Sequence, residues 1–412
     1  MDRMIKWVWL TTLKGMYSAK ITALLDKFDS IDEIYAAAEA EYRGIPTLRN
    51  KDIEALCDKN TAEAEKVIAR TAAAGGYIMT FDSDNYPERL KRLVNPPYVL
   101  YVKGNFDFSK TRVNIGVVGT RKYTDYGYAV TSKMCIDLAI AGFTVVSGLA
   151  TGIDSISAAA ALRAGAETIA VLGCGIDIIY PRENEDLFRQ ITMHGAVISE
   201  YPPMTMPLRT NFPERNRIIA ALSDCLLVTE APKKSGSLIT AKYAHEMGID
   251  IFSVPGNIFE QNSVGTNKLI KAGAKPALSP LDIIDEFSAA LKTAEKPAPG
   301  TNFLNKGLHH FENQKKKPET KEKNNKEKTN EIQNGSVTEI KPKAADTERF
   351  STLSEEERKI ADIILSAGRI SVDEIIRQSG LAASRVNSIL PLLEIEGVVD
   401  KHAGNLYTVS EE

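Results

Sequence analysis

The chain has 412 residues, enough for roughly two to four domains, and its hydrophobic content of 43% lets at least one of them bury a full core. The net charge is −3 and the pI about 6.1, so a polyanionic partner would have to meet a local basic patch. The four cysteines form no CxxC pair and the five histidines no HExxH motif. The apolar run Trp7–Leu10 is too short for a signal or membrane segment. We therefore expect a cytoplasmic protein with reduced thiols and with neither a resident metal nor a cofactor.

Residues 1–72 alternate between helical segments and short loops. The run at 10–28 predicts a helix, a glycine turn and a second helix, which is compatible with a helix-hairpin-helix module or with plain helical packing. Two apolar strands follow, Tyr77–Phe81 and Tyr98–Val102, separated by a proline-containing segment. We interpret them as the lead-in to the main domain, which we place at 73–290.

The main domain shows β/α alternation from residue 111 to about 287. Its apolar runs are continuous rather than alternating, which is typical of strands covered on both faces. The predicted fold is therefore α/β, with a doubly wound, mostly parallel sheet of the extended Rossmann type. The predicted strands are Val113–Val118, Phe143–Ser147, Thr168–Gly173, Ala196–Ser199, Cys225–Thr229 and Asp250–Val254.

The C-terminal third contains two segments of different composition. Residues 291–350 are rich in lysine and poor in apolar residues, which predicts a disordered linker. Residues 351–412 recover helical periodicity and predict three short helices and a strand, the order of a winged helix. The candidate recognition helix, Ala382–Ile395, carries only Arg385 as a cation. DNA binding by this module and a role in packing or protein docking therefore both stay open.

The turns that follow the predicted strands are rich in Gly, Ser and Thr. None is a GxGxxG dinucleotide fingerprint and the chain has no GxxxxGK[ST] P-loop, so hydride transfer and ATP hydrolysis are not indicated. Turns of this composition can hold phosphates on backbone N–H groups, and parallel strands bring them to one edge of the sheet. They are Gly119-Thr120-Arg121, Ser147-Gly148 with Thr151-Gly152, Gly173-Cys174-Gly175 and Ser235-Gly236-Ser237.

The stretch NFPERNRIIAALSD at 211–224 places Arg215, Asn216 and Arg217 directly before an apolar helical run. Cations at a helix start oppose the helix dipole, so these arginines need a carboxylate partner or a bound anion. Glu214, Asp224 and Glu230 are candidate carboxylates. The hypothesis we favour is that both arginines reach phosphates. Phe212 fits either a stacking platform for a base or a loop anchor, and Arg209 lies nearby in sequence.

A family resemblance runs through the same region. GTRKYTDYG, SGLATGID, AVLGCGIDIIYPRENEDL, ISEYPP, NFPERNRIIAALSD, SGSLITA and VPGNIFEQNSVGTNKLIKAGA follow in the order of the bacterial DNA-processing protein A family, DprA or Smf, over about 75–287. The resemblance implies a recombination mediator rather than an enzyme. Such a protein binds and protects single-stranded DNA and loads the RecA recombinase onto it during natural transformation. It also implies a homodimer, a sterile-alpha-motif-like domain at the N-terminus and a winged-helix-like domain at the C-terminus.

The candidate residues for binding single-stranded DNA or phosphate combine the turns with the motifs that match the family. Thr151 stands where the family usually has an arginine, so one basic contact is expected to be missing. The candidates are Gly119, Thr120, Arg121, Ser147, Gly148, Gly152, Arg209, Asn211, Phe212, Arg215, Asn216, Arg217, Ser235, Gly236 and Ser237.

Two other classes of function stay open. Phosphoribohydrolases with similar strand-end turns carry PGGxGTxxE, and aligning that signature on SGSLIT puts Thr240 where the catalytic glutamate should be. Asp154 or Glu230 could in principle act as an acid or base, although a carboxylate at a strand end is more often a cap or ion pair. The third class is a sensor of a small signalling nucleotide. Competition between mononucleotides and oligonucleotides would separate these classes.

Overall fold

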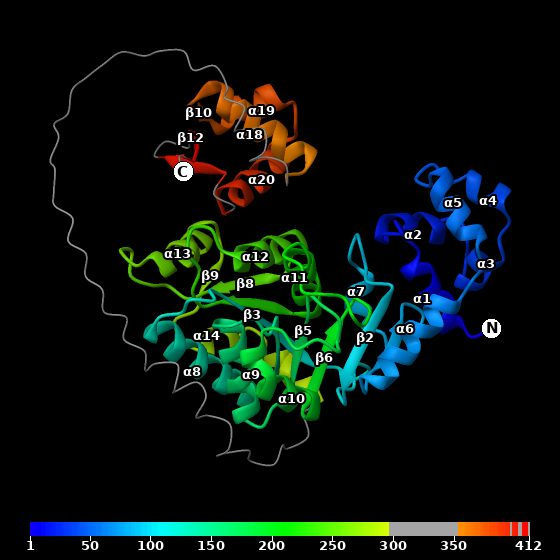
Figure 1. Ribbon diagram of the computed structural model, residues 1–412. Helices are drawn as coiled ribbons and strands as arrows, with labels where there is room; N and C mark the ends of the chain where they lie inside the picture. The colour runs from blue at the N-terminus through cyan, green and yellow to red at the C-terminus, as the bar shows by residue number, and fades with distance from the viewer. Residues whose placement is uncertain (296–352, 396–397, 403–405, 411–412) are drawn as a thin grey trace, which may run out of the picture. The chain divides into compact units, whose positions relative to one another are not determined.

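The computed structural model describes residues 1–295, 353–395, 398–402 and 406–410 (Figure 1). The chain divides into two compact units, Met1–Phe303 and Leu304–Glu412. The predicted linker begins inside a described helix, Ser288–Thr293, and its remainder from 296 to 350 lies outside the described residues. No helix in the described part of the chain is long and apolar enough to cross a membrane.

The first unit is built on a nine-stranded sheet with the order β1-β2-β6-β5-β4-β3-β7-β8-β9. All neighbours from β6 to β9 pair in parallel, whereas β1 with β2 and β2 with β6 are antiparallel. The strands are β1 (Tyr77–Thr80), β2 (Val99–Gly104), β3 (Val113–Val118), β4 (Phe143–Ser147), β5 (Thr168–Val171), β6 (Gly195–Ser199), β7 (Cys225–Val228), β8 (Asp250–Ser253) and β9 (Lys275–Pro276). The prediction of a doubly wound, mostly parallel sheet is confirmed.

Helices cover both faces of this sheet, with α8–α10 on one face and α11–α13 on the other (Figure 1). The chain order reverses at β3, which lies between β4 and β7, so β3 is the topological switch point where doubly wound sheets bind ligands. The helices are α7 (Glu88–Lys91), α8 (Asp125–Ala141), α9 (Ile153–Arg163), α10 (Glu185–Met193), α11 (Asn211–Leu222), α12 (Gly236–Glu246), α13 (Val264–Lys271), α14 (Leu281–Ile284) and α15 (Ser288–Thr293).

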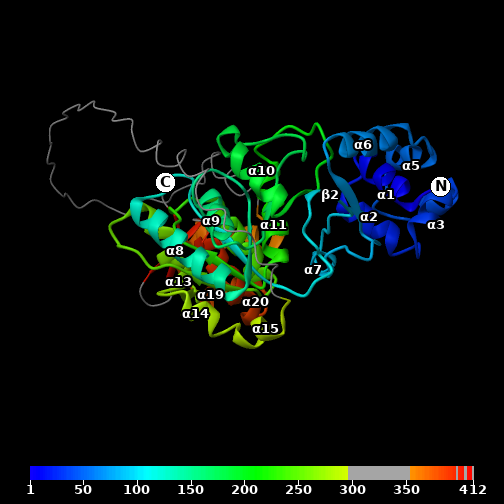
Figure 2. The same cartoon turned by 90° about the horizontal axis from the view of Figure 1, so that it is seen from below.

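The N-terminal helices pack on the antiparallel end of the sheet. Figure 2 shows them gathered beside β2. They share one buried cluster with Tyr98, Val99 and Tyr101, and the Trp7 ring stacks on Tyr98 with centroids 5.7 Å apart. The segment we interpreted as a lead-in is thus part of the sheet and completes the core of the helices. These are α1 (Arg3–Thr12), α2 (Ser18–Leu25), α3 (Ile31–Ala36), α4 (Glu39–Arg43), α5 (Asn50–Cys57) and α6 (Ala62–Ala73).

The second unit has its own hydrophobic core, formed by three helices and a three-stranded sheet in the order β10-β12-β11. This is the predicted winged-helix arrangement, with more strands than the sequence indicated. Arg385, the one cation of the candidate recognition helix, pairs with Glu356 at 2.6 Å. The elements are α18 (Glu355–Ala367), β10 (Ile370–Ser371), α19 (Val372–Ser379), α20 (Ala383–Ile395), β11 (Val399–His402) and β12 (Leu406–Val409).

Candidate functional site

Two of the glycine-rich turns predicted from the sequence, those after β3 and β4, meet at the carboxyl ends of these strands. The Ile153 N–H at the start of α9 donates to the Thr120 carbonyl (3.2 Å). Gly152 has φ +86°, and a Cβ there would lie 2.4 Å from the Thr120 carbonyl oxygen. Only glycine tolerates both this conformation and this close approach. The two turns are therefore interlocked, and they place Gly119, Thr120 and Arg121 beside the N-terminus of α9.

Beside these turns lies an open hollow of about 440 Å³ with aromatic rings and cations in its wall. The Tyr180 and Phe212 rings lie 5.6 Å apart, and the Arg121 guanidinium lies 5.6 Å from the centre of the Phe212 ring. Arg121 is exposed and Tyr180 is 40% exposed, so both are available to a ligand. The lining residues are Arg121, Gly148, Ala150, Thr151, Tyr180, Pro181, Arg182, Glu183 and Phe212.

Tyr180 and Arg182 are site residues that the sequence analysis missed. Both belong to the run IIYPRENEDL, where an aromatic residue and an arginine flank a proline soon after a strand. Thr151, where the resemblance leads us to expect an arginine, also lines the hollow. Arg182, which is exposed, supplies a different cation in the same wall.

Arg215 lies beneath the hollow and is buried. Its guanidinium donates to the Gly148 carbonyl (2.7 Å) and to the Val171 carbonyl, and so ties together the ends of β4 and β5. Burial lowers the pKa of Arg215, and the nearby Asp154 acts in the opposite direction. Asp154 is also buried, which raises the pKa of its carboxyl to about 6 although Arg215 favours the charged form. Arg215 thus holds in place the backbone at the ends of β4 and β5, next to the hollow.

The position of the arginines within α11 corrects one premise of the sequence analysis. The helix begins at Asn211, so Arg215 and Arg217 are its fifth and seventh residues and lie beyond the first turn, where the dipole acts most strongly. The unfavourable helix start that we used to argue for a bound anion is therefore wrong. The carboxylate partner also differs from all three that we considered, because Arg217 pairs bidentately with Glu200 (2.9 and 2.6 Å).

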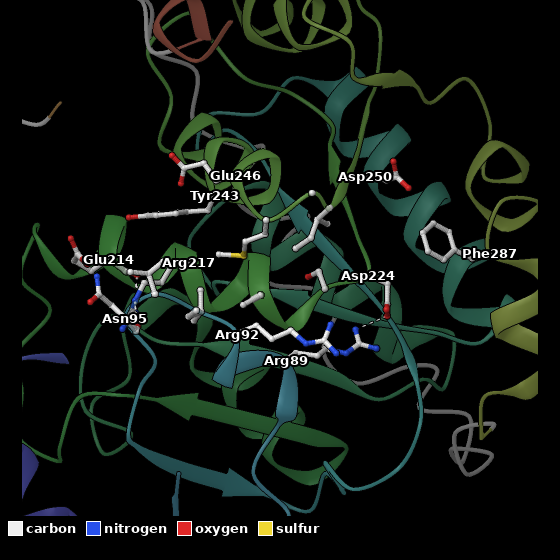
Figure 3. Close-up of a pocket in the computed structure, with 17 residues that line it drawn as sticks. Arg89, Arg92, Asn95, Glu214, Arg217, Asp224, Tyr243, Glu246, Asp250 and Phe287 are labelled. Carbon is white, nitrogen blue, oxygen red and sulfur yellow. Dashed lines mark hydrogen bonds and ion pairs between the residues drawn. The ribbon is translucent and has the colours of Figure 1, made fainter. Parts of the chain in front are cut away.

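Arg217 is not among the residues that line the aromatic hollow and lines instead a larger one of about 860 Å³ (Figure 3). The labelled side chains of this second hollow include Arg89, Asn95, Glu214 and Asp224. Its charges are largely satisfied within the protein: Arg89 pairs with Asp224 at 2.6 Å, and Arg217 donates to the Asn95 carbonyl (3.2 Å) besides pairing with Glu200. Two of the three arginines that line the larger hollow are therefore engaged within the protein.

Of the predicted residues, Arg121, Gly148 and Phe212 line the hollow, and the others lie outside its lining. Asn211 anchors the start of α11 by donating to the Gly173 carbonyl (3.1 Å), and Asn216 donates to the Gly236 carbonyl (3.2 Å), which ties the Ser235–Ser237 turn to α11. Ser147 is buried and donates to the Val117 carbonyl (2.6 Å), so its hydroxyl serves the sheet. Arg209 is exposed and lies outside the residues that line the hollow.

The buried carboxylate of Glu230 has a structural task at the same edge. It accepts hydrogen bonds from the Thr124 backbone N–H (3.0 Å) and hydroxyl, and thereby holds the start of α8. Thr240, which aligns with the catalytic glutamate of phosphoribohydrolases, is buried in α12. Within the described residues, no group of three or more His, Cys, Asp or Glu side chains could hold a metal ion.

Fold and site together define an extended Rossmann-like protein with an arginine- and aromatic-lined hollow at its switch point, followed by a winged helix. A family profile described as DNA recombination-mediator protein A matches residues 77–288, and one described as DprA winged helix domain matches residues 342–405. The chain therefore belongs to the DNA recombination-mediator protein A family, whose members are named DprA or Smf.

Individual relatives agree with this assignment. Protein Smf of Synechocystis is 38% identical over 287 residues, which cover 69% of this chain and 72% of that protein. DNA processing protein DprA of Bacillus subtilis is 40% identical over 248 residues, or 59% of this chain and 84% of that protein. The X-ray structure of DNA processing protein A from Streptococcus pneumoniae superposes with a TM-score of 0.61 at 32% identity, covering 69% of this chain and 98% of that one.

Proposed function

We propose that this recombination mediator binds single-stranded DNA along the carboxyl edge of its sheet. The observation that carries the proposal is the pair of rings, Tyr180 and Phe212, set beside the guanidinium groups of Arg121 and Arg182. Proteins that bind single strands without reading their sequence combine aromatic platforms for bases with cations that follow the backbone. The hollow offers both within one opening.

In this mechanism the two kinds of group have separate tasks. Arg121 and Arg182 neutralise phosphates, aided by the N-terminus of α9 beside the interlocked turns. A base stacks on the exposed Tyr180 or on Phe212. Arg215 acts from below by fixing the ends of β4 and β5, so that the turns keep their positions when the strand binds. Sequence preference is expected to be weak because every base presents a π-face.

The test is fluorescence anisotropy of a labelled mixed-sequence oligonucleotide at several salt concentrations. We expect Arg121→Ala and Arg182→Ala to weaken binding and to reduce the logarithmic salt slope by about 0.7 for each phosphate that is no longer neutralised. Arg189→Ala is the matched control, because this exposed arginine on α10 pairs with Glu185 away from the hollow. An unchanged slope in both hollow variants would mean that these arginines do not touch phosphates.

The same titration separates the alternatives. Competition by AMP as strong as that by the oligonucleotide would favour a sensor of small nucleotides. A phosphoribohydrolase has less support, because buried Thr240 replaces the glutamate and Glu230 is engaged with Thr124. We therefore infer a binding protein rather than an enzyme.

We further propose that the protein loads the RecA recombinase onto the bound strand, as expected for natural transformation. The support is family membership together with a site for single strands. The test is recombinase filament formation on an oligonucleotide already coated with single-strand-binding protein. Wild-type protein should accelerate filament formation, whereas Arg121→Ala, at concentrations where it fails to bind DNA, should not. Equal acceleration by the variant would uncouple loading from this site.

A homodimer is also proposed. Ile258 and Phe259 are 77% and 85% exposed, and Leu278 and Leu281 are 75% and 60% exposed. Large apolar side chains at such exposure near one end of a domain are typical of an interface. In sedimentation velocity the wild type should form a dimer, and either Phe259→Ser or Leu278→Ser should weaken its association. A wild type that stays monomeric at every concentration would contradict the proposed homodimer.

A further inference from the structure

The segment between β6 and α11, residues 200–210, presents three large apolar side chains to solvent. Met204, Met206 and Leu208 are 61%, 62% and 56% exposed. Single exposed apolar residues are ordinary on protein surfaces, but contiguous ones are found where something binds. Three exposed apolar side chains within five residues, close in sequence to the proposed DNA site, indicate that this segment contacts a ligand.

Met204 also holds a strained backbone conformation. Its φ is +70°, and Met204 and Leu149 are the non-glycine residues with positive φ in the described part of the chain. Glycine would adopt this conformation freely, whereas a side chain makes it costly. The Asp177 carboxylate fixes the turn by accepting from the Met204 N–H (2.9 and 3.0 Å). Because the Met204 side chain is exposed, packing does not explain why a methionine stands here, and such strain is typical of functional sites.

The segment is tied to the parts of the chain that form the hollow. The Gly175 N–H donates to the Thr205 carbonyl (2.9 Å), and Asp177, which holds Met204, lies three residues before Tyr180. At its other end the segment runs directly into Asn211 and Phe212 at the start of α11. These contacts connect the segment to the two parts of the chain that carry the Tyr180 and Phe212 rings.

We propose that Met204, Met206 and Leu208 form a second platform, on which nucleobases of the single strand rest after leaving the Tyr180–Phe212 rings. The inference rests on the proposed binding of single-stranded DNA and extends that site. Methionine suits the task because its unbranched, polarizable side chain adapts to aromatic faces of different shape. Arg209 in the same segment is exposed and Arg182 lines the hollow, and their charge favours a polyanion over an apolar protein surface.

The test uses the triple variant Met204→Gly, Met206→Ala, Leu208→Ala. Glycine at 204 keeps the positive φ, and the other two side chains are exposed, so the fold is expected to persist and its melting temperature not to fall. Binding to a mixed-sequence oligonucleotide should weaken roughly tenfold, with an unchanged salt slope because every phosphate keeps its cation. Binding to an abasic oligonucleotide of equal length should not change. Met193→Ala, which removes a 59% exposed methionine at the end of α10, is the matched control.

Three results would overturn the inference. The first is equal affinity of the triple variant and the wild type for the mixed-sequence strand. The second is an equal loss of affinity for the mixed and the abasic strands, which would mean that no base touches the platform. The third is dissociation of a wild-type dimer by the triple change, which would make the segment an interface between copies. Failure of the wild type to bind any single strand would instead reject the proposed function itself.

Discussion

Removal of the Arg217 side chain would leave the largely buried Glu200 carboxylate without its ion-pair partner. The Arg217 and Glu200 side chains are 10% and 17% exposed and joined by two hydrogen bonds. Arg217→Ala is therefore expected to lower the free energy of unfolding by about 2–3 kcal/mol, since breaking a largely buried pair from one side leaves an unpaired charge. Urea denaturation measures it. Arg189→Ala, which breaks an exposed pair with Glu185, should cost less than about 0.5 kcal/mol. Similar losses of stability in both variants would contradict a structural role for Arg217.

Asp154 gives the protein a stability that depends on pH. Burial raises the pKa of its carboxyl to about 6 in the folded protein, so the folded state binds the proton more tightly than the unfolded chain. The contribution is fully present below about pH 4 and is lost as the pH rises through about 6, by roughly 2–3 kcal/mol in total. Melting curves between about pH 4.5 and 7.5 should show this loss in the wild type and not in Asp154→Asn. Asp137→Asn, at an exposed position on α8, should keep the wild-type profile.

At the scale of elements, the site depends on how closely α9 approaches the turn after β3. A methyl group at Gly152 would meet the Thr120 carbonyl and the Arg121 Cα, whereas Gly248, which also has positive φ (+69°), has open space around it. Gly248→Ala should cost about 1 kcal/mol, the ordinary penalty for a side chain in this conformation. Gly152→Ala should cost more and should also weaken oligonucleotide binding, because it displaces Arg121. Thermal melting and anisotropy measure the two effects, and equal behaviour of both variants would contradict the close approach.

Sequence patterns predicted the elements better than they predicted the partners of individual residues. β3 and β4 were predicted with their observed bounds, because a continuous apolar run between turns is a local signal. Antiparallel pairing of β2 with β6 was not predicted, since it joins segments almost a hundred residues apart. The account of Arg217 was wrong because its partner, Glu200, lies 17 residues earlier, just after β6, and only the fold brings the two side chains together. Tyr180 was omitted for another reason, because it belongs to an irregular segment without periodicity.

At the scale of the whole molecule, the two compact units are expected to contribute unequally to DNA binding. Arg385 of the winged helix is already paired with Glu356, and the described part of this unit carries eight Asp or Glu residues against six Lys or Arg, so we expect it to offer little to a phosphate chain. A protein comprising residues 1–295 should therefore bind the oligonucleotide with the affinity and salt slope of the full chain. Anisotropy with both proteins at matched salt measures this. A reduced slope for the shorter protein would show that the second unit touches phosphates.

The place of β2 in the sheet also has a consequence for the order of events during synthesis. The N-terminal helices complete their core with residues of β2 and with Ile176, and β2 in turn pairs with β6, which ends at Ser199. The pairing of β3 is also incomplete until β7, which begins at Cys225, has been synthesised. Helices α1–α6 thus cannot finish folding until roughly a hundred residues after them have emerged from the ribosome, a delay on the order of ten seconds at ordinary elongation rates. During that interval the apolar face around Trp7 and Trp9 is an early substrate for chaperones.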